Sequence, residues 1–334
     1  MDTWLKPLKF DPLPVLLNSG DEAVQYFARR DLLGKPVGSL SRIWQLCAPQ
    51  KILKKQWADG FWSHPGEKKH LAVHYPLIET WKQFRVLVEQ YGFTRQHPQI
   101  QKAAEFLFTC QTEEGDFRGF LANQYATYYT GAILSLLIQA GYGEDPRVEK
   151  GFGWLLSMRQ ADGGWTIPLL THPFDRKTIY RLTSQYAHPV EPDRSKPFSH
   201  NWTGMVLRAF AVHPIYRFSE AAWVAACLLK SRFFHPDCYS AYQAASYWVR
   251  FDYPFWWNNL VAALDSISLI GLSREDEQIA EGLSWLVDHQ DDGGLWKVSY
   301  AKPLEEEKQT SKTMSQKLWV TLAICRVLKR FYHP

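Results

Sequence analysis

The sequence has no long apolar run. No stretch of its 334 residues approaches the roughly 18 uninterrupted apolar residues that span a membrane. The N-terminal residues "MDTWLKPLKFDPLP" hold no apolar block long enough for a signal peptide, so we expect a cytoplasmic protein without a transmembrane segment. A basic tract is also missing, because the net charge is only +4 and the lysines and arginines are scattered among acids. Nucleic acid is therefore not an expected partner.

Cysteine is scarce, and its five copies are an odd number. Four of them lie in runs with helical spacing, which favours buried free thiols over a disulfide framework. The five are Cys47, Cys110, Cys227, Cys238 and Cys325. Aromatic residues, by contrast, are abundant: the chain has 15 Trp, 16 Tyr and 19 Phe, and 46% of it is hydrophobic. Such a chain can bury a sizeable core, and we expect residues 1–334 to form a single domain.

A short pattern recurs along the chain: Gln, three residues, Gly, one residue and an aromatic. The four copies read QWADGFW, QTEEGDF, QADGGWT and QDDGGLW, and start at Gln56, Gln111, Gln160 and Gln290. In the third copy Trp165 comes one place early. The gap before the last copy is about twice the others, so a degenerate copy is expected near residues 230–235. The pattern therefore predicts five units.

Each copy follows one helical run and precedes another. The runs after the copies are apolar around most of their circumference, whereas the runs before them are amphipathic. Helical pairs can stack as an open solenoid or close into a ring, and two kinds of helix favour closure. We predict an all-α fold, an α/α toroid of five to six helical hairpins. The second runs are residues 75–90, 123–140, 201–212, 254–270 and 315–331, and a further candidate helix covers residues 21–33.

The repeated Gln-x-x-x-Gly-x-Trp/Phe element resembles the QW motif of the terpenoid cyclase and protein prenyltransferase superfamily, which includes squalene-hopene cyclases. The tail "QKLWVTLAICRVLKRFY" is similar to the last inner helix of small bacterial proteins with prenyltransferase/squalene-cyclase repeats. The resemblance implies the α/α toroid fold. It also implies that the Gln amide ties the end of an outer helix to the start of the next inner helix, with the aromatic packed over it. Gln160, Gly164 and Trp165 are then stability residues.

The links that follow the motif are long. They cover residues 63–75, 166–199, 232–253 and 297–314, and the direction of the chain puts them all at one end of the fold. The N-termini of the second helices point there, which suits an anion. We expect residues 166–199 to act as a lid that carries Arg181 and other cations.

Aromatic residues on the second helices predict a lined central cavity. With the cationic end, such a cavity suits an apolar or amphiphilic small molecule that bears a carboxylate or diphosphate, and aromatic faces can stabilise carbocations. The alternative is that these rings only fill the core. The candidate substrate-binding residues are Tyr125, Tyr128, Tyr129, Trp202, Trp256, Trp257, Asn258, Arg181 and Arg250; Trp81 and Trp319 are further candidate lining residues.

Acid chemistry has one candidate. The Asp-x-Asp-Asp acid of class II terpene cyclases and the Asp-Asp-x-x-Asp signature of ionising synthases are both absent. The remaining candidate is Asp252, beside Arg250, and its alternative roles are a helix cap or an ion pair. The sequence "HPDC" at residues 235–238 fails to match the zinc ligands of protein prenyltransferases, so we expect no metal and no cofactor.

A second chemistry stays open. Toroidal polysaccharide lyases use a Tyr or His base and an Asn or Arg that neutralises a carboxylate. Such groups are supplied by His200 and Asn201 in the stretch SHNW (residues 199–202), by Asn258 and Asn259, and by nearby tyrosines. The alternative is that His200 begins a helix. The leading hypothesis is thus a terpenoid-cyclase-like or prenyltransferase-like protein that binds an isoprenoid-like or other amphiphilic anionic molecule, with catalysis undecided. A non-catalytic binding or scaffold toroid and a lyase-like enzyme are the alternatives, and the oligomeric state is unknown.

Overall fold

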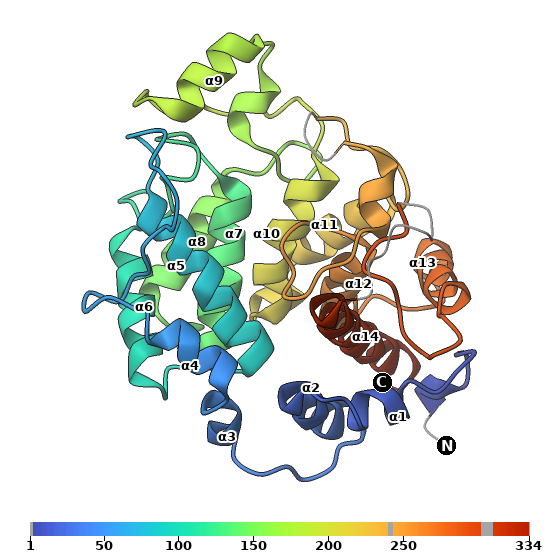
Figure 1. Cartoon of the computed structure of the whole chain (residues 1–334). Coiled ribbons are helices and arrows are strands. Elements are labelled where there is room, and N and C mark those ends of the chain that lie inside the picture. The colour runs from blue at the N-terminus through green and yellow to red at the C-terminus, as the bar shows by residue number, and fades with distance from the viewer. Residues whose placement is uncertain (1–2, 240–242, 302–309, 334) are drawn as a thin grey trace. The chain divides into compact units, whose positions relative to one another are not determined.

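The computed structural model describes residues 3–239, 243–301 and 310–333 (Figure 1). This part of the chain is helical and contains isolated β-bridges but no strand, which confirms the all-α class. Within it, no helix is both long and apolar enough to cross a membrane. Parts of the two predicted links at 232–253 and 297–314 lie outside the described residues. The helices are α1 (Leu13–Leu17), α2 (Glu22–Phe27), α3 (Ser41–Trp44), α4 (Cys47–Leu53), α5 (Tyr75–Arg85), α6 (Pro98–Thr109), α7 (Thr127–Leu137), α8 (Pro146–Ser157), α9 (Arg176–Ser184), α10 (His200–Val212), α11 (Glu220–Lys230), α12 (Leu260–Ile270), α13 (Glu277–Asp288) and α14 (Ser311–Tyr332).

The chain forms two compact units. Unit 1 combines Met1–Ile43 with Ala226–Pro334, and unit 2 is Trp44–Ala225. The closure of all hairpins into one ring, and with it the single domain over residues 1–334, stays a prediction.

Five helix pairs correspond to the five predicted units. They are α4 with α5, α6 with α7, α8 with α10, α11 with α12, and α13 with α14. Two of the second helices are buried nearly all round: in α7 only Tyr129 is not buried, and in α10 only Val212. By contrast, α5 buries 5 of its 11 residues and α14 buries 11 of its 22. In unit 2, α7 and α10 pack so closely at Gly131 that a Cβ at this position would lie only 2.6 Å from the Cα of Val206. The predicted succession of helices is observed in the described residues, whereas the predicted difference between first and second helices holds for α7, α10 and α12 but not for α5 and α14.

Two of the predicted second helices begin later than expected. The run at 123–140 becomes helical only at Thr127, and the run at 254–270 only at Leu260. Asn259 caps the latter helix, since its Oδ1 accepts the Ala262 N–H at 3.0 Å. Residues 254–259 are therefore a turn that leads into α12, and the aromatic residues there are not on the helix.

The glutamine of the motif fastens two first helices to each other. Gln56 Nε2 donates to the Gly60 carbonyl (2.9 Å) and to the carbonyl of Gln99 in α6 (2.8 Å). Gln111 Nε2 repeats this with Gly115 (2.7 Å) and with Arg147 in α8 (2.9 Å). The expectation that the amide reaches the next inner helix is wrong for these copies, because its second partner lies at the start of the next outer helix.

The third copy is shifted by one residue. Arg159 Nε donates to the Gly163 carbonyl at 3.0 Å, in the place that the glutamine amide takes in the other copies. Gly163, not Gly164, carries the positive φ of 99°. Counted from Arg159, Trp165 is the sixth residue, as Trp62 is from Gln56. Trp165 is thus in register, and Gln160 makes different bonds, to the Asp193 and Lys196 carbonyls at 2.8 and 2.9 Å.

The aromatic residue of the motif joins the two helices of its own pair. Trp165 Nε1 donates to the Leu155 carbonyl in α8 at 2.7 Å, while the Trp165 backbone N–H donates to Thr203 Oγ1 in α10 at 2.8 Å. A threonine on the second helix accepts this backbone bond in all four copies. The pairs are Trp62 with Thr80 (3.1 Å), Phe117 with Thr130 (3.1 Å), Trp165 with Thr203 (2.8 Å) and Trp296 with Thr321 (3.2 Å).

We expect Thr203→Val to lower the free energy of unfolding by about 1–3 kcal/mol, because it leaves the buried Trp165 N–H without its acceptor while it keeps the side-chain volume. Urea denaturation measures the change. Thr203→Ser keeps the hydroxyl and is the matched control, which should lose about 0.8 kcal/mol for the methyl group. Equal stability of Thr203→Val and the wild type would contradict the role of this bond.

Candidate functional site

Five aromatic rings form a continuous row across three helices of unit 2. The ring centroid of Tyr129 lies 5.0 Å from that of Trp81 on α5 and 3.6 Å from that of Phe120. The ring centroid of Tyr128 lies 4.3 Å from that of Tyr129 and 4.5 Å from that of Trp202 on α10. Tyr129 is half-buried and the other four rings are buried. The structure thus brings together four residues that the sequence predicts for the cavity wall, and adds Phe120, which the sequence analysis missed. We call these five residues the aromatic row.

A cation lies over one end of the aromatic row. The Arg85 guanidinium carbon is 5.1 Å from the centroid of the Trp81 ring, one helical turn away on α5. Arg85 is half-buried, so its charge is less screened than that of an exposed arginine. The row therefore combines an apolar surface with a positive group, and the i,i+4 spacing of Trp81 and Arg85 was the signal that could have revealed it.

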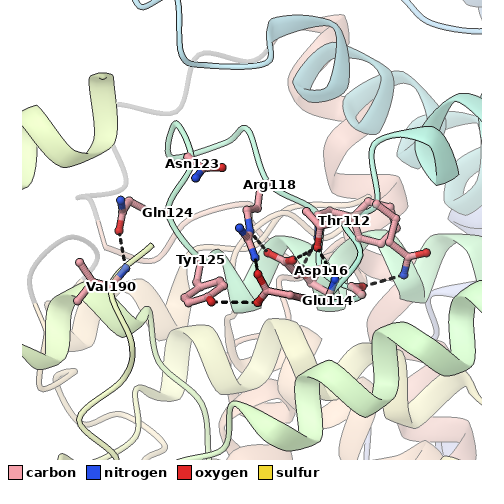
Figure 2. Close-up of polar contacts among 12 residues, drawn as sticks. Thr112, Glu114, Asp116, Arg118, Asn123, Gln124, Tyr125 and Val190 are labelled. Atoms are coloured by element: carbon pink, nitrogen blue, oxygen red, sulfur yellow. Dashed lines mark hydrogen bonds and ion pairs between the residues drawn. The ribbon is translucent and has the colours of Figure 1, made fainter. Parts of the chain in front are cut away.

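Tyr125 belongs to a polar cluster instead of the aromatic row (Figure 2). Its hydroxyl lies 2.9 Å from Glu114 Oε2 and 3.0 Å from Glu191 Oε1. Burial and these two carboxylates raise the pKa of Tyr125 above its usual value. The Arg118 guanidinium carbon lies 4.7 Å from the centroid of the Tyr125 ring and pairs with Glu114. Tyr125 thus holds segments together, and its predicted contact with substrate stays a prediction.

Asp116 is the fully buried acid of this cluster. Its carboxylate accepts hydrogen bonds from Thr112 Oγ1 and from Arg118 Nε, the latter at 2.9 Å (Figure 2). Burial raises the pKa of Asp116, and the bonds from Arg118 and Thr112 offset this only in part. At Glu114 burial is outweighed by the hydrogen bonds from Arg118 and Tyr125, so the pKa of Glu114 is lowered. This cluster was not predicted from the sequence, although Glu114 and Asp116 lie within the second motif copy and Arg118 follows it directly.

The cluster anchors most of the segment that was predicted as a lid. Asn123 Nδ2 donates to the Ala187 carbonyl at 3.2 Å, and Gln124 pairs with both the His188 carbonyl (3.0 Å) and the Val190 N–H (3.0 Å). Gln160 holds the segment again at residues 193–196. Of the predicted lid at 166–199, α9 is the part that stands away from α7 and α10 (Figure 1). Arg181 lies on α9 and is exposed.

His200 begins α10 and is 4% exposed, next to Ser199, whose Oγ caps the helix by accepting the Trp202 N–H at 3.3 Å. The predicted alternative, that His200 begins a helix, is therefore what the backbone shows. The roles of His200 as a base and of Asn201 as a carboxylate partner stay predictions.

Asp252 braces the turn before α12 in unit 1. Its Oδ2 accepts the Trp256 N–H at 2.8 Å and its Oδ1 accepts from Asn259 Nδ2 at 3.1 Å. Asn259 in turn caps the helix. Both carboxylate oxygens thus fix the local backbone, which fits a positioning role, and the assignment of Asp252 as a catalytic acid stays a prediction.

The remaining predicted residues of unit 1 lie around this turn. Trp256 and Trp257 are half-buried, with centroids 5.9 Å apart. Asn258 is 3% exposed, and neither atom of its amide has a hydrogen-bond partner among the described residues. Arg250 lies over the Tyr247 ring, with 4.1 Å between the guanidinium carbon and the centroid. It stays a prediction that these residues bind the same ligand as the aromatic row of unit 2.

One family model matches part of the chain. Residues 70–178, about a third of the chain, match the family model of the squalene-hopene cyclase C-terminal domain. This match confirms the resemblance to the terpenoid cyclase superfamily that the repeat predicted. It covers α5 to α8 and the polar cluster up to Tyr125. No curated protein sequence matches the chain.

Particular solved structures are similar at low identity. The type II terpene cyclase MstE from Scytonema is 13% identical with a TM-score of 0.34, over 87% of this chain and 98% of that chain. A variant of the same cyclase in complex with geranylgeranyl dihydroxybenzoate is 12% identical with a TM-score of 0.36, over 87% and 97%. A protein from Actinoplanes is 15% identical with a TM-score of 0.30, over 87% and 99%.

We expect the free energy of unfolding of Tyr125→Phe to fall less steeply with rising alkaline pH than that of the wild type. Because the pKa of Tyr125 is raised in the folded state, its contribution is complete below the unfolded pKa of about 10 and is lost as pH rises through the folded pKa. Urea denaturation between pH 7 and pH 11 should show a smaller loss in the variant than in the wild type. Tyr186→Phe removes an exposed hydroxyl and should keep the wild-type profile. Identical profiles of wild type and Tyr125→Phe would contradict the expectation.

Asp252→Asn should lower the free energy of unfolding by about 1–3 kcal/mol. Both oxygens of Asp252 accept a hydrogen bond, so the NH2 group of the new asparagine would replace one acceptor and face a donor, either the Trp256 N–H or Asn259 Nδ2. Asp288→Asn changes an exposed acid of the same unit and should stay within about 0.5 kcal/mol of the wild type. Chemical denaturation of both variants checks this. A fully stable Asp252→Asn would mean that the carboxylate does not brace the turn.

Proposed function

We propose that the protein binds an isoprenoid-like or other amphiphilic anionic small molecule, with the aromatic row as its apolar binding surface. The observation that carries this proposal is the contact of five rings across α5, α7 and α10. Five adjoining rings offer the apolar chain of such a ligand a larger contact area than isolated rings in a core do. The Arg85 guanidinium over Trp81 would receive a carboxylate or diphosphate at one end.

The family match supports the same ligand class. It spans residues 70–178 and includes Trp81, Phe120, Tyr128 and Tyr129. The isoprenoid nature of the ligand and the cytoplasmic location are part of the proposal. The other proposed ligand or catalytic residues are Asp252, Trp256, Trp257, Asn258 and Arg250 of unit 1, and His200 and Arg181 of unit 2.

Catalysis is a separate question from binding. Asp252 and Asp116 both accept two hydrogen bonds from the protein, an arrangement that favours structural roles. Incubation with a bound prenyl compound and analysis of the products distinguishes an enzyme from a binding or scaffold protein. The lyase alternative draws less support, since His200 is 4% exposed and a polymer would have to reach it.

Titration with geranylgeranyl diphosphate should quench tryptophan fluorescence, because Trp81 and Trp202 lie in the aromatic row, whereas inorganic diphosphate should not. Tyr129→Leu should weaken binding by about 2- to 10-fold, from roughly 0.5–1.5 kcal/mol for lost ring contacts. Tyr142→Leu replaces a half-buried tyrosine beyond the other end of α7 and is the matched control. Native mass spectrometry of the protein from its own host gives an independent readout.

Absence of any response to geranylgeranyl diphosphate, together with no co-purifying amphiphile, would overturn the proposal and favour the scaffold alternative. Equal weakening by Tyr129→Leu and Tyr142→Leu would show that the aromatic row is not the binding surface.

A further inference from the structure

Helix α9 and the loop beside it expose apolar side chains that the proposed ligand site does not use. Tyr180 on α9 is 62% exposed, Tyr186 just after it is 75% exposed, and Leu71 is 97% exposed. The loop contacts α9 directly, since the His70 and Tyr180 rings lie 5.6 Å apart. In unit 2, α9 stands beyond the neighbouring helices (Figure 1). Exposed leucine and tyrosine at such a place indicate an interaction surface.

The same surface is positively charged. It carries five exposed cations, and among the described residues no carboxylate lies within ion-pair distance of any of them. The acids of the same segments are Glu67, which is exposed, and Asp175, which caps α9 by accepting the Thr178 N–H at 2.7 Å, so the five cations leave a net positive charge. Leu71, Tyr180, Tyr186 and the five cations together are named the α9 surface. The cations are Lys68, Lys69, Arg176, Lys177 and Arg181.

The α9 surface combines exposed leucine and tyrosine side chains with cations, and one kind of partner can contact both. An acidic peptide would use the charges but would leave Leu71 exposed, and it would need a groove, whereas α9 is a projecting helix. A membrane that contains anionic lipids accepts both groups at once: leucine and tyrosine enter the interface, and lysine and arginine meet the phosphates. We propose that the α9 surface docks the protein on an anionic membrane.

This docking needs no transmembrane helix and does not depend on the proposed ligand. It would hold unit 2 with the α9 end toward the lipid. The N-termini of α7 and α10, where Tyr128 and Trp202 of the aromatic row lie, face the same end (Figure 1).

Vesicle sedimentation of the full chain, without added ligand, tests the proposal. Phosphatidylcholine vesicles that contain phosphatidylserine should bind the protein, vesicles of phosphatidylcholine alone should bind it far less, and added salt should weaken the binding. The triple variant Lys68→Gln, Arg176→Gln, Lys177→Gln should lower the partition coefficient by about 100-fold, at about fivefold per cation. Leu71→Ser should lower it as well, with little effect on folding because the side chain is 97% exposed.

The matched control removes three exposed lysines from α4 and the residues just after it: Lys51→Gln, Lys54→Gln, Lys55→Gln. It has the same change of charge and should bind vesicles like the wild type. Equal losses in both triple variants, or no binding of the wild type to phosphatidylserine vesicles at low salt, would overturn the proposal. Because geranylgeranyl diphosphate binding is measured in solution, failure of either proposal leaves the other testable.

Discussion

The hydrogen bond from the backbone of the motif aromatic to a threonine on the second helix is the contact that four of the five helix pairs share. It recurs at Thr80, Thr130, Thr203 and Thr321, at distances of 2.8–3.2 Å. In three of the copies the indole N–H also bonds the first helix, ten residues back along the chain. A single residue therefore fixes the end of one helix against the start of its partner, and the buried polar groups of both are satisfied.

This contact also decides where the site residues lie. Because α7 and α10 are held in their first turns, at Thr130 and Thr203, these turns come together in unit 2, and the aromatic row forms there. The polar cluster is built on the same element, since Asp116 and Arg118 flank the motif residue Phe117. Fold stability and the candidate site thus share residues, which is why acids such as Asp116 are engaged in structural bonds.

The two candidate surfaces differ in kind. Four of the five rings of the aromatic row are buried, and the row lies close to the motif residues, whereas the α9 surface is exposed and carries cations without ion-pair partners among the described residues. Burial makes the row suitable for selective binding of an apolar chain. Exposure makes the α9 surface suitable for contact with a large partner that brings its own negative charge.

The sequence by itself determined the helical class and the order of the helices, because these follow from local periodicity and composition. It also offered four of the five rings of the aromatic row, but only within a larger set of candidate lining residues. The tertiary structure decided which groups meet. The threonine partners lie 18, 13, 38 and 25 residues from their aromatics, so no fixed spacing marks them. Arg159 in place of a glutamine, Tyr125 between two carboxylates, and Asp252 as a brace likewise depend on segments that only folding brings within hydrogen-bond distance. A hydrogen bond is defined by distance and direction in space, and sequence spacing across loops of different length fixes neither.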